Sequence, residues 1–209
     1  MGILANSLPK VALSATLILL AAAAVHAQDA PERTMARSSW GITGAVGFGT
    51  AIADVSCSNC GNDARPGTLY GSSGFVRLGG VYRSQAIIAV QADWWKGGSQ
   101  DPRERTAASL ATTNVVIQWY LPRANRWFLT GGLGMAFVSD DYLSTVDNGD
   151  KSARGLGYEL GFGYEVPVGP HISITPVASY FGTPGSRIRG TDERMGGSVA
   201  QLAVGIGWR

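Results

Sequence analysis

The stretch GLGYELGFGYEV, residues 155–166, alternates between large apolar side chains and small or charged ones. One parity carries Leu156, Tyr158, Leu160, Phe162, Tyr164 and Val166, and the other carries Gly157, Glu159, Gly161, Gly163 and Glu165. A period of two residues is typical of a β-strand, whose successive side chains point to opposite faces. The charged residues share a face with glycines, so we expect that face to line a narrow interior. We expect the face with the large apolar side chains to contact lipid.

Seven further segments show the same alternation. They are residues 40–52, 75–83, 86–95, 113–121, 127–137, 171–180 and 201–209. Eight strands of roughly ten residues suit an antiparallel barrel that spans a bilayer. The sequence therefore predicts an all-β fold, an eight-stranded antiparallel transmembrane β-barrel with up-and-down topology.

The connections between these segments alternate in length. Long polar connections cover residues 54–73, 96–109, 138–154 and 181–197, and short turns cover 83–85, 122–126 and 167–171. Outer-membrane barrels have long extracellular loops and short periplasmic turns. We therefore expect both termini on the periplasmic side.

The N-terminal region has the features of a signal peptide. Lys10 precedes the apolar residues 11–25, a run too short for a comfortable membrane span, and Val25-His26-Ala27 offers small residues at a cleavage site. We predict a signal peptide over 1–27, a short periplasmic segment over 28–38 and a barrel domain over 39–209. The alternative is an uncleaved anchor helix. Export predicts the outer membrane of a Gram-negative-type envelope.

The charge balance argues against a nucleic-acid partner. Of 17 basic residues one, Lys10, falls in the predicted signal peptide, which leaves 16 against 15 acidic residues. After Ala27 no apolar run reaches the ~18 residues that a transmembrane helix needs. Strands that enter lipid must close into a barrel, because only closure satisfies their backbones. The structural alternative is a soluble barrel such as a lipocalin, which would place its charges outside.

Aromatic residues mark both ends of the predicted strands. Near the short turns lie Trp40, Tyr82, Trp119, Trp127 and Trp208, and near the long connections lie Trp94, Phe137, Tyr158 and Tyr180. Two aromatic girdles are typical of a barrel with a membrane interface on each side.

Residues 39–209 resemble the small outer-membrane β-barrel proteins of the OmpA/OmpX/Ail type. The resemblance rests on GLGYELGFGYEV, on LTGGLGMAF (129–137) and on the last strand. Such proteins end in a signal that the barrel-assembly machinery reads, which implies this role for Gln201, Ala203, Ile206 and Trp208. Ala203 stands where the signal has glycine, and Arg209 follows the aromatic residue at which the family usually stops.

Arg77, Asp93 and Glu159 fall on the inward parity at similar depth. An unpaired charge in a narrow lumen is costly, so we expect these side chains to pair in a charge network. Such a network can be a plug that fills the barrel, or part of a gated pore or proton path. The small diameter of eight strands favours the plug.

Cys57 and Cys60 form a CxxC motif in the first long connection. A disulfide that stiffens this connection suits an oxidising compartment. The alternatives are a redox dithiol, which usually opens a helix in a thioredoxin-like fold, and half of a zinc site, which lacks a second ligand pair. We expect no metal and no cofactor.

His171 and Ser173 resemble the His-x-Ser pair of PagL-type lipid A deacylases. Ile174 stands where that family has asparagine, and the pair is expected at the periplasmic end, away from lipid A. We therefore expect a non-enzymatic protein with a structural or surface-interaction role through its extracellular loops. A small low-conductance channel and a lipid A-modifying enzyme are the alternatives.

Basic residues collect in the predicted outer connections, namely Arg65, Arg103, Arg105, Arg187, Arg189 and Arg194. Arginines at an outer rim can bind lipopolysaccharide phosphates or an anionic extracellular surface, or they can be ordinary solvated charges. The expected partners are thus outer-membrane lipid and lipopolysaccharide, the barrel-assembly machinery and an extracellular surface ligand.

Overall fold

Eight long strands make up the barrel in the computed structural model, which describes residues 41–58, 67–83, 85–98, 107–122, 124–140, 151–188 and 194–209. They are β1 (Ile42–Ser58), β2 (Gly67–Arg83), β3 (Ala86–Gly98), β4 (Ala107–Leu121), β5 (Ala124–Asp140), β6 (Lys151–Tyr164), β8 (Ile172–Ile188) and β9 (Arg194–Trp208). A two-residue strand, β7 (Val166–Pro167), follows β6. The described residues include no helix with the length and apolarity needed to cross a membrane. The predicted signal peptide and Trp40 lie outside the described residues.

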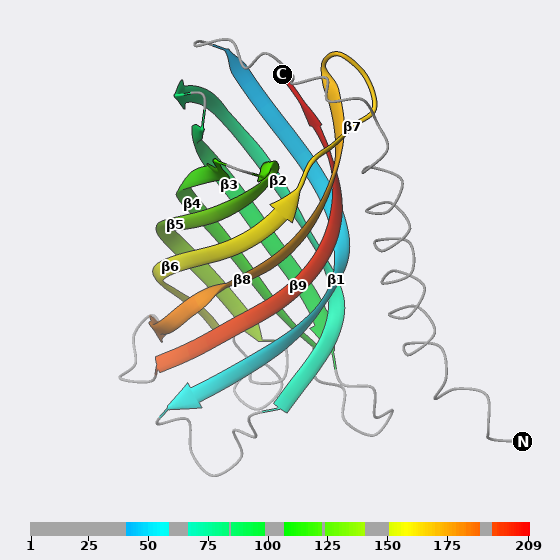
Figure 1. The fold of residues 1–209 in the computed structure, drawn as a ribbon. Helices are drawn as coiled ribbons and strands as arrows, with labels where there is room; N and C mark the ends of the chain where they lie inside the picture. Colours follow the sequence, from blue (N-terminus) through cyan, green and yellow to red (C-terminus); the bar gives the residue numbers. More distant parts are fainter. Residues whose placement is uncertain are drawn as a thin grey trace, which may run out of the picture. The chain divides into compact units, whose positions relative to one another are not determined.

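Every long strand pairs antiparallel with its neighbours, and the sheet closes on itself (Figure 1). The first and last strands, β1 and β9, pair along their length, and β6 pairs with β8. The predicted eight-stranded antiparallel up-and-down barrel is therefore confirmed. We call the end that carries Gly41 and Trp208 the turn end, and the end at which β1 stops and β2 begins the loop end.

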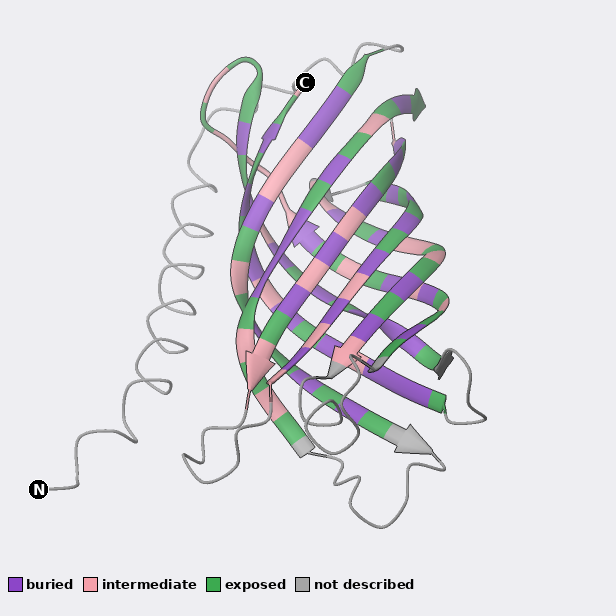
Figure 2. Cartoon of the chain, turned by 180° about the vertical axis from the view of Figure 1, so that it is seen from behind, coloured by how far each residue is buried: buried purple, intermediate pink, exposed green. Residues whose placement is uncertain are grey.

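Burial alternates along the strands, as Figure 2 shows. On β6, Leu160 is 63% exposed whereas its neighbour Glu159 is 1% exposed. The large apolar side chains face outward and the small or charged ones face inward. Over this part of the strands, the arrangement is therefore the reverse of that in a soluble protein.

The strands are longer than the sequence indicated. Parts of the predicted long connections continue the strands, so the prediction is wrong for residues 54–58, 67–73, 96–98, 107–109, 138–140, 151–154, 181–188 and 194–197. The outward side chains at these ends are polar and exposed, as at Asp54, Lys96 and Arg154. The alternation between large apolar and small side chains therefore ends before the strands do, while the backbone hydrogen bonds between strands continue.

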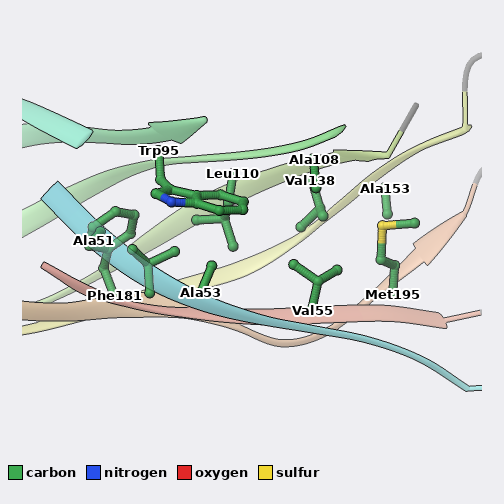
Figure 3. Close-up of a cluster of buried hydrophobic side chains, with 11 residues drawn as sticks. Ala51, Ala53, Val55, Trp95, Ala108, Leu110, Val138, Ala153, Phe181 and Met195 are labelled. Atoms are coloured by element: carbon green, nitrogen blue, oxygen red, sulfur yellow. The ribbon is translucent and has the colours of Figure 1, made fainter. Parts of the chain in front are cut away.

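Two apolar clusters fill much of the interior. The loop-end cluster consists of Ala51, Ala53, Val55, Trp95, Ala108, Leu110, Val138, Ala153, Phe181, Met195 and Val199 (Figure 3). The turn-end cluster consists of Phe75, Val81, Ile87, Ala89, Val116, Tyr120, Phe128, Val177 and Ala203. The large inward rings were not anticipated from the sequence.

Inward rings fit because glycines face them. A Cβ on Gly163 would lie 2.3 Å from Cζ of Phe128, and a Cβ on Gly47 would lie 2.3 Å from Cε1 of Phe75. On the outer face a Cβ on Gly44 would lie 2.1 Å from Cζ2 of Trp208. Glycine is therefore needed at these positions for close approach of a ring.

We expect Gly163→Ala to lower the free energy of unfolding by about 1–3 kcal/mol, because the new methyl group overlaps the Phe128 ring. Gly131→Ala is the matched control, since the nearest atom to its Cβ would be Leu160 Cδ2 at 3.8 Å. Urea unfolding in lipid vesicles, followed by tryptophan fluorescence, measures both. Equal stabilities for the two variants would contradict the packing argument.

Candidate functional site

The middle of the barrel holds a group of buried polar side chains that we call the central polar cluster: Arg77 on β2, Gln91 and Asp93 on β3, Gln118 on β4 and Glu159 on β6. All five are buried. They come from four strands, and the inward parity of each strand brings them together. The structure thus places the three charges named from the sequence in one interior region.

Gln91 connects the charges of the central polar cluster. It lies opposite Arg77 in the β2–β3 register, and Arg77 Nε donates to its Oε1 at 2.5 Å. The amide nitrogen of Gln91 donates to Asp93 Oδ1 at 2.8 Å and to Glu159 Oε1 at 2.5 Å. One neutral side chain therefore forms hydrogen bonds with a cation on one side and with two carboxylates on the other.

The hydrogen bonds connect Arg77 to the two carboxylates through Gln91, which the predicted charge network did not include. The hydrogen bonds of Arg77 run to the side-chain oxygens of Gln91 and Gln118. The register explains this, because Asp93 stands diagonal to Arg77 and the position directly opposite belongs to Gln91. The two glutamines were missed, although both lie on the inward parity of segments that the sequence identified.

Surrounding groups pack tightly on the central polar cluster. Thr112 donates to Asp93 Oδ2 at 3.4 Å, and Asn114 Nδ2 donates to the Thr112 hydroxyl at 3.0 Å. The Arg77 guanidinium lies 5.6 Å from the Phe75 ring centroid and 5.8 Å from that of Phe128. Buried charges of this kind are tolerated only where hydrogen bonds and close packing replace water.

Arg209 closes the turn end of the interior. Its guanidinium forms an ion pair with Glu165, donates to the Tyr120 hydroxyl at 2.8 Å and lies 5.4 Å from the Tyr120 ring centroid. Burial lowers the pKa of Arg209, but the attraction of Glu165 and Tyr120 outweighs this and raises the pKa above its ordinary value. The residue that departs from the family ending is thus part of the interior.

The polar contacts run without a break from the chain end to the barrel centre. Gln118 Nε2 donates to the Tyr120 hydroxyl at 2.5 Å, and Gln118 also accepts from Arg77. Beside this path a pocket opens between Thr43, Arg77, Ser173, Thr175 and Arg209, with about 20 Å³ of free space. That space holds roughly one water molecule, so it does not admit an organic substrate.

His171 and Ser173 differ in their surroundings. His171 is exposed in the turn before β8, whereas Ser173 is buried inside the barrel. The Ser173 hydroxyl lies over Gly207, 2.9 Å from where a Cβ of that glycine would stand. In the described ranges there is also no group of three or more His, Cys, Asp or Glu side chains that could hold a metal ion.

The predicted girdle residues lie on the outer wall. Tyr82, Trp119, Tyr180 and Trp208 are exposed, and Trp94, Trp127 and Tyr158 are half-buried. Trp94 contacts the Phe48 ring at a centroid distance of 5.8 Å, and Trp127 stacks on Phe162 at 4.8 Å.

The last strand places the four residues of the predicted assembly signal on both faces of the wall. Gln201 and Ala203 are buried inside the barrel, and Ile206 and Trp208 are exposed outside. The Cys57 backbone lies opposite Met195 on β9, while its side chain and Cys60 are outside the described residues.

Comparison with known proteins supports the barrel architecture. A family model described as an outer membrane protein beta-barrel domain matches residues 15–209. Neisserial surface protein A (NspA) is 16% identical, with a TM-score of 0.51 over 80% of this chain and 98% of that chain. This likeness, at so low an identity, shows the fold alone.

Two other solved structures are similar at lower scores. Ail, the attachment invasion locus protein of Yersinia pestis in complex with the heparin analogue sucrose octasulfate, is 14% identical, with a TM-score of 0.48 over 80% of this chain and 99% of that chain. OprG from Pseudomonas aeruginosa is 13% identical, with a TM-score of 0.46 over 83% of this chain and 99% of that chain. No curated protein sequence matches the chain.

We expect Gln91→Leu to destabilise the barrel, because it leaves Arg77, Asp93 and Glu159 without their shared partner. The loss is about 1–3 kcal/mol for each group left unsatisfied. Thr130→Val is the control, since it removes a buried hydroxyl that has no hydrogen-bond partner and should be neutral or slightly stabilising. Urea titration of both refolded variants measures the difference. A stable Gln91→Leu barrel would show that the amide is not the bridge.

Proposed function

We propose that the chain, which belongs to the outer membrane protein β-barrel domain family, is a non-enzymatic scaffold, a closed barrel that presents its four loop-end connections to an extracellular surface. In this proposal the loop end faces the outside and both termini face the periplasm. The signal peptide ends at residue 27, residues 28–38 precede the barrel, and residues 39–209 form it.

The filled interior is the observation that carries this proposal. The loop-end cluster, the central polar cluster and the Arg209–Glu165–Tyr120 contacts follow one another along the axis. A channel needs a continuous aqueous path, and an eight-stranded barrel has an interior only wide enough for side chains. Contacts with other molecules are then left to the outer wall and the connections.

The loop end is built as a rigid support for the connections. Its strands continue beyond the lipid-facing band, with exposed polar residues such as Asp54 and Lys96 outside and the loop-end cluster inside. This is the arrangement of a water-exposed domain, which buries apolar groups and solvates polar ones. The connections that join β1 to β2, β3 to β4, β5 to β6 and β8 to β9 all start from this end.

The orientation follows from the unequal connections. At the turn end β2 and β3 are separated by residues 84–85 only, and β4 and β5 by residues 122–123. Outer-membrane barrels keep such short turns on the periplasmic side. We therefore place the central charges between a periplasmic closure at Arg209 and an outer closure at the loop-end cluster.

We expect purified wild-type protein to give no conductance steps in a planar bilayer, because packed side chains block the interior at both ends. A general porin measured in the same bilayer shows that insertion is detectable. Heat-modifiable mobility on an unboiled gel confirms that the inserted protein is folded. Steady single-channel openings would replace the scaffold by the channel alternative, and an altered lipid A mass in expressing cells would support the enzyme alternative.

We also propose that Gln201, Ala203, Ile206 and Trp208 form the signal that the barrel-assembly machinery reads. Trp208 lies opposite Gly44 and Ile172, at the point where the last strand closes on the first. Its ring covers Gly44. The residue therefore stands at the seam where β9 pairs with β1 and closes the barrel.

We expect Trp208→Ala to accumulate as a protease-sensitive periplasmic species, because it removes the aromatic element of the signal. Trp94→Ala is the matched control, because the Trp94 ring covers Gly74 as the Trp208 ring covers Gly44. Each variant therefore loses a similar packing contribution to the free energy of unfolding, of order 1.5–3 kcal/mol. Membrane fractionation and protease digestion compare the two. Equal outer-membrane yields for wild type and Trp208→Ala would show that the last strand is not this signal.

A further inference from the structure

The charges of the central polar cluster do not balance. The cluster contains two carboxyl groups, Asp93 and Glu159, and one cation, Arg77, and each of these residues is at most 5% exposed. In the sheet β4 and β5 separate β3 from β6, so Asp93 and Glu159 meet across the interior (Figure 1). With all three groups ionised, the cluster would carry an uncompensated negative charge within the lipid-facing band, which is costly.

The other charged residues on the inward parity lie at the turn end. Among the residues that the structure describes, they are Arg126, Glu165 and Arg209. Glu165 follows Glu159 by six residues, about 20 Å along the strand, and it is ion-paired with Arg209. Arg126 precedes Gly132, the β5 residue opposite Glu159, by the same six residues. These charges therefore form a separate group, and they do not act as close counter-charges for the central polar cluster.

Asp93 and Glu159 are close neighbours. Gln91 Nε2 donates to Asp93 Oδ1 at 2.8 Å and to Glu159 Oε1 at 2.5 Å, so a single nitrogen bridges the two carboxyl groups. Two negative charges this close and away from water repel each other strongly. Carboxyl groups in such a site share one proton because both cannot be ionised together.

Arg77 does not remove this repulsion by direct contact. Its Nε and Nη1 donate to the side-chain oxygens of Gln91 and Gln118, and its Nη2 has no hydrogen-bond partner in the part of the chain that the structure describes. The cation therefore reaches both carboxyl groups only through the Gln91 amide. That amide can donate to a carboxyl oxygen whether the group is ionised or protonated, so the bridge does not require two negative charges.

The hydrogen bonds indicate which oxygen holds the proton. Asp93 accepts at both oxygens, from Gln91 at Oδ1 and from Thr112 at Oδ2. Glu159 accepts from Gln91 at Oε1, whereas its Oε2 is buried without a hydrogen-bond partner among the described residues. An ionised carboxylate only accepts hydrogen bonds, whereas a protonated one carries a donor of its own. The unpartnered Oε2 of Glu159 is therefore the position that a proton fits.

We propose that the central polar cluster is a proton-binding site, in which Glu159 holds one proton at Oε2 and Asp93 stays ionised. One carboxylate and one guanidinium then remain, so the cluster is neutral. The two carboxyl groups are coupled, and the proton belongs to the pair with Glu159 as its main position. A metal cation would neutralise the same charge, but it needs several oxygen ligands at bonding distance. A proton needs no such space in a packed interior.

The proton exchanges with water at the turn end. Polar contacts run from Arg209 through the Tyr120 hydroxyl and Gln118 to Arg77, beside the water-sized pocket that Arg77 and Gln118 line. Towards the loop end the interior is occupied by the apolar side chains of the loop-end cluster. The site is therefore connected to one end of the barrel and insulated from the other.

Infrared spectroscopy of the refolded full-length barrel in lipid vesicles at neutral pH tests the proposal. A protonated carboxyl group gives a C=O stretching band that is separate from the carboxylate and amide bands and shifts in D2O. We expect wild type to show this band with the intensity of one group per barrel. Glu159→Gln should lose it and still fold, because glutamine is neutral and similar in shape to protonated glutamate. Asp93→Asn should also lose the band, because Glu159 then becomes the single carboxylate that balances Arg77.

Glu165→Gln is the matched control. Glu165 is also an inward carboxyl group on the chain segment that includes β6, but it is ion-paired with Arg209 at the turn end. We expect this variant to keep the band at the intensity of wild type. Heat-modifiable mobility shows that every variant is folded.

Three results would overturn the proposal. A folded wild-type barrel without the band would show that both carboxyl groups are ionised, and a metal ion retained in native mass spectrometry would then identify the counter-charge. A band that survives in folded Glu159→Gln would place the proton elsewhere. A band that survives in folded Asp93→Asn would show that the charge of the pair does not hold the proton. Because the band is measured on isolated protein, its outcome does not depend on the conductance test of the proposed function.

Discussion

The pairing of β1 with β9 is the constraint on which the rest of this structure depends. Strand backbones in lipid have no water to bond to, so the sheet has to close. Closure with eight strands fixes an interior that side chains fill. Every large inward group then needs a small one beside it, and the glycines at 47 and 163, which lie under the Phe75 and Phe128 rings, meet this demand. The alternation between large and small residues in the sequence follows from this packing requirement.

The interior changes in character along the barrel. Behind the band whose outer face carries Leu156, Leu160 and their equivalents, the interior holds the central polar cluster, linked by Gln91, and the apolar turn-end cluster. Where the outer face turns polar, the interior becomes apolar around Trp95 and Phe181. Burial of apolar area from water stabilises that end as it does a soluble core. In the lipid-facing band, stability has to come from hydrogen bonds and packing instead.

The sequence predicted the barrel because large and small side chains alternate wherever the wall faces lipid. It did not predict the strand ends at residues such as Asp54 and Arg154, because the outward side chains there are polar. It identified Arg77, Asp93 and Glu159 by charge and parity but missed Gln91, since a neutral amide carries no such signal until the register places it opposite Arg77.

Arg209 contributes to the closure of the barrel at the turn end. The residue follows the last strand, yet its side chain returns to the interior and pairs with Glu165. Glu165 stands where β6 ends and β7 begins, and its amide donates to the Arg126 carbonyl at 2.9 Å. The ion pair therefore joins the final residue to an interruption in a strand on another part of the wall. Because the Arg209 amide also donates to the His171 carbonyl at 3.1 Å, the chain end is held from both its backbone and its side chain. The contacts of Arg209 thus add to the closure that the β1–β9 seam begins.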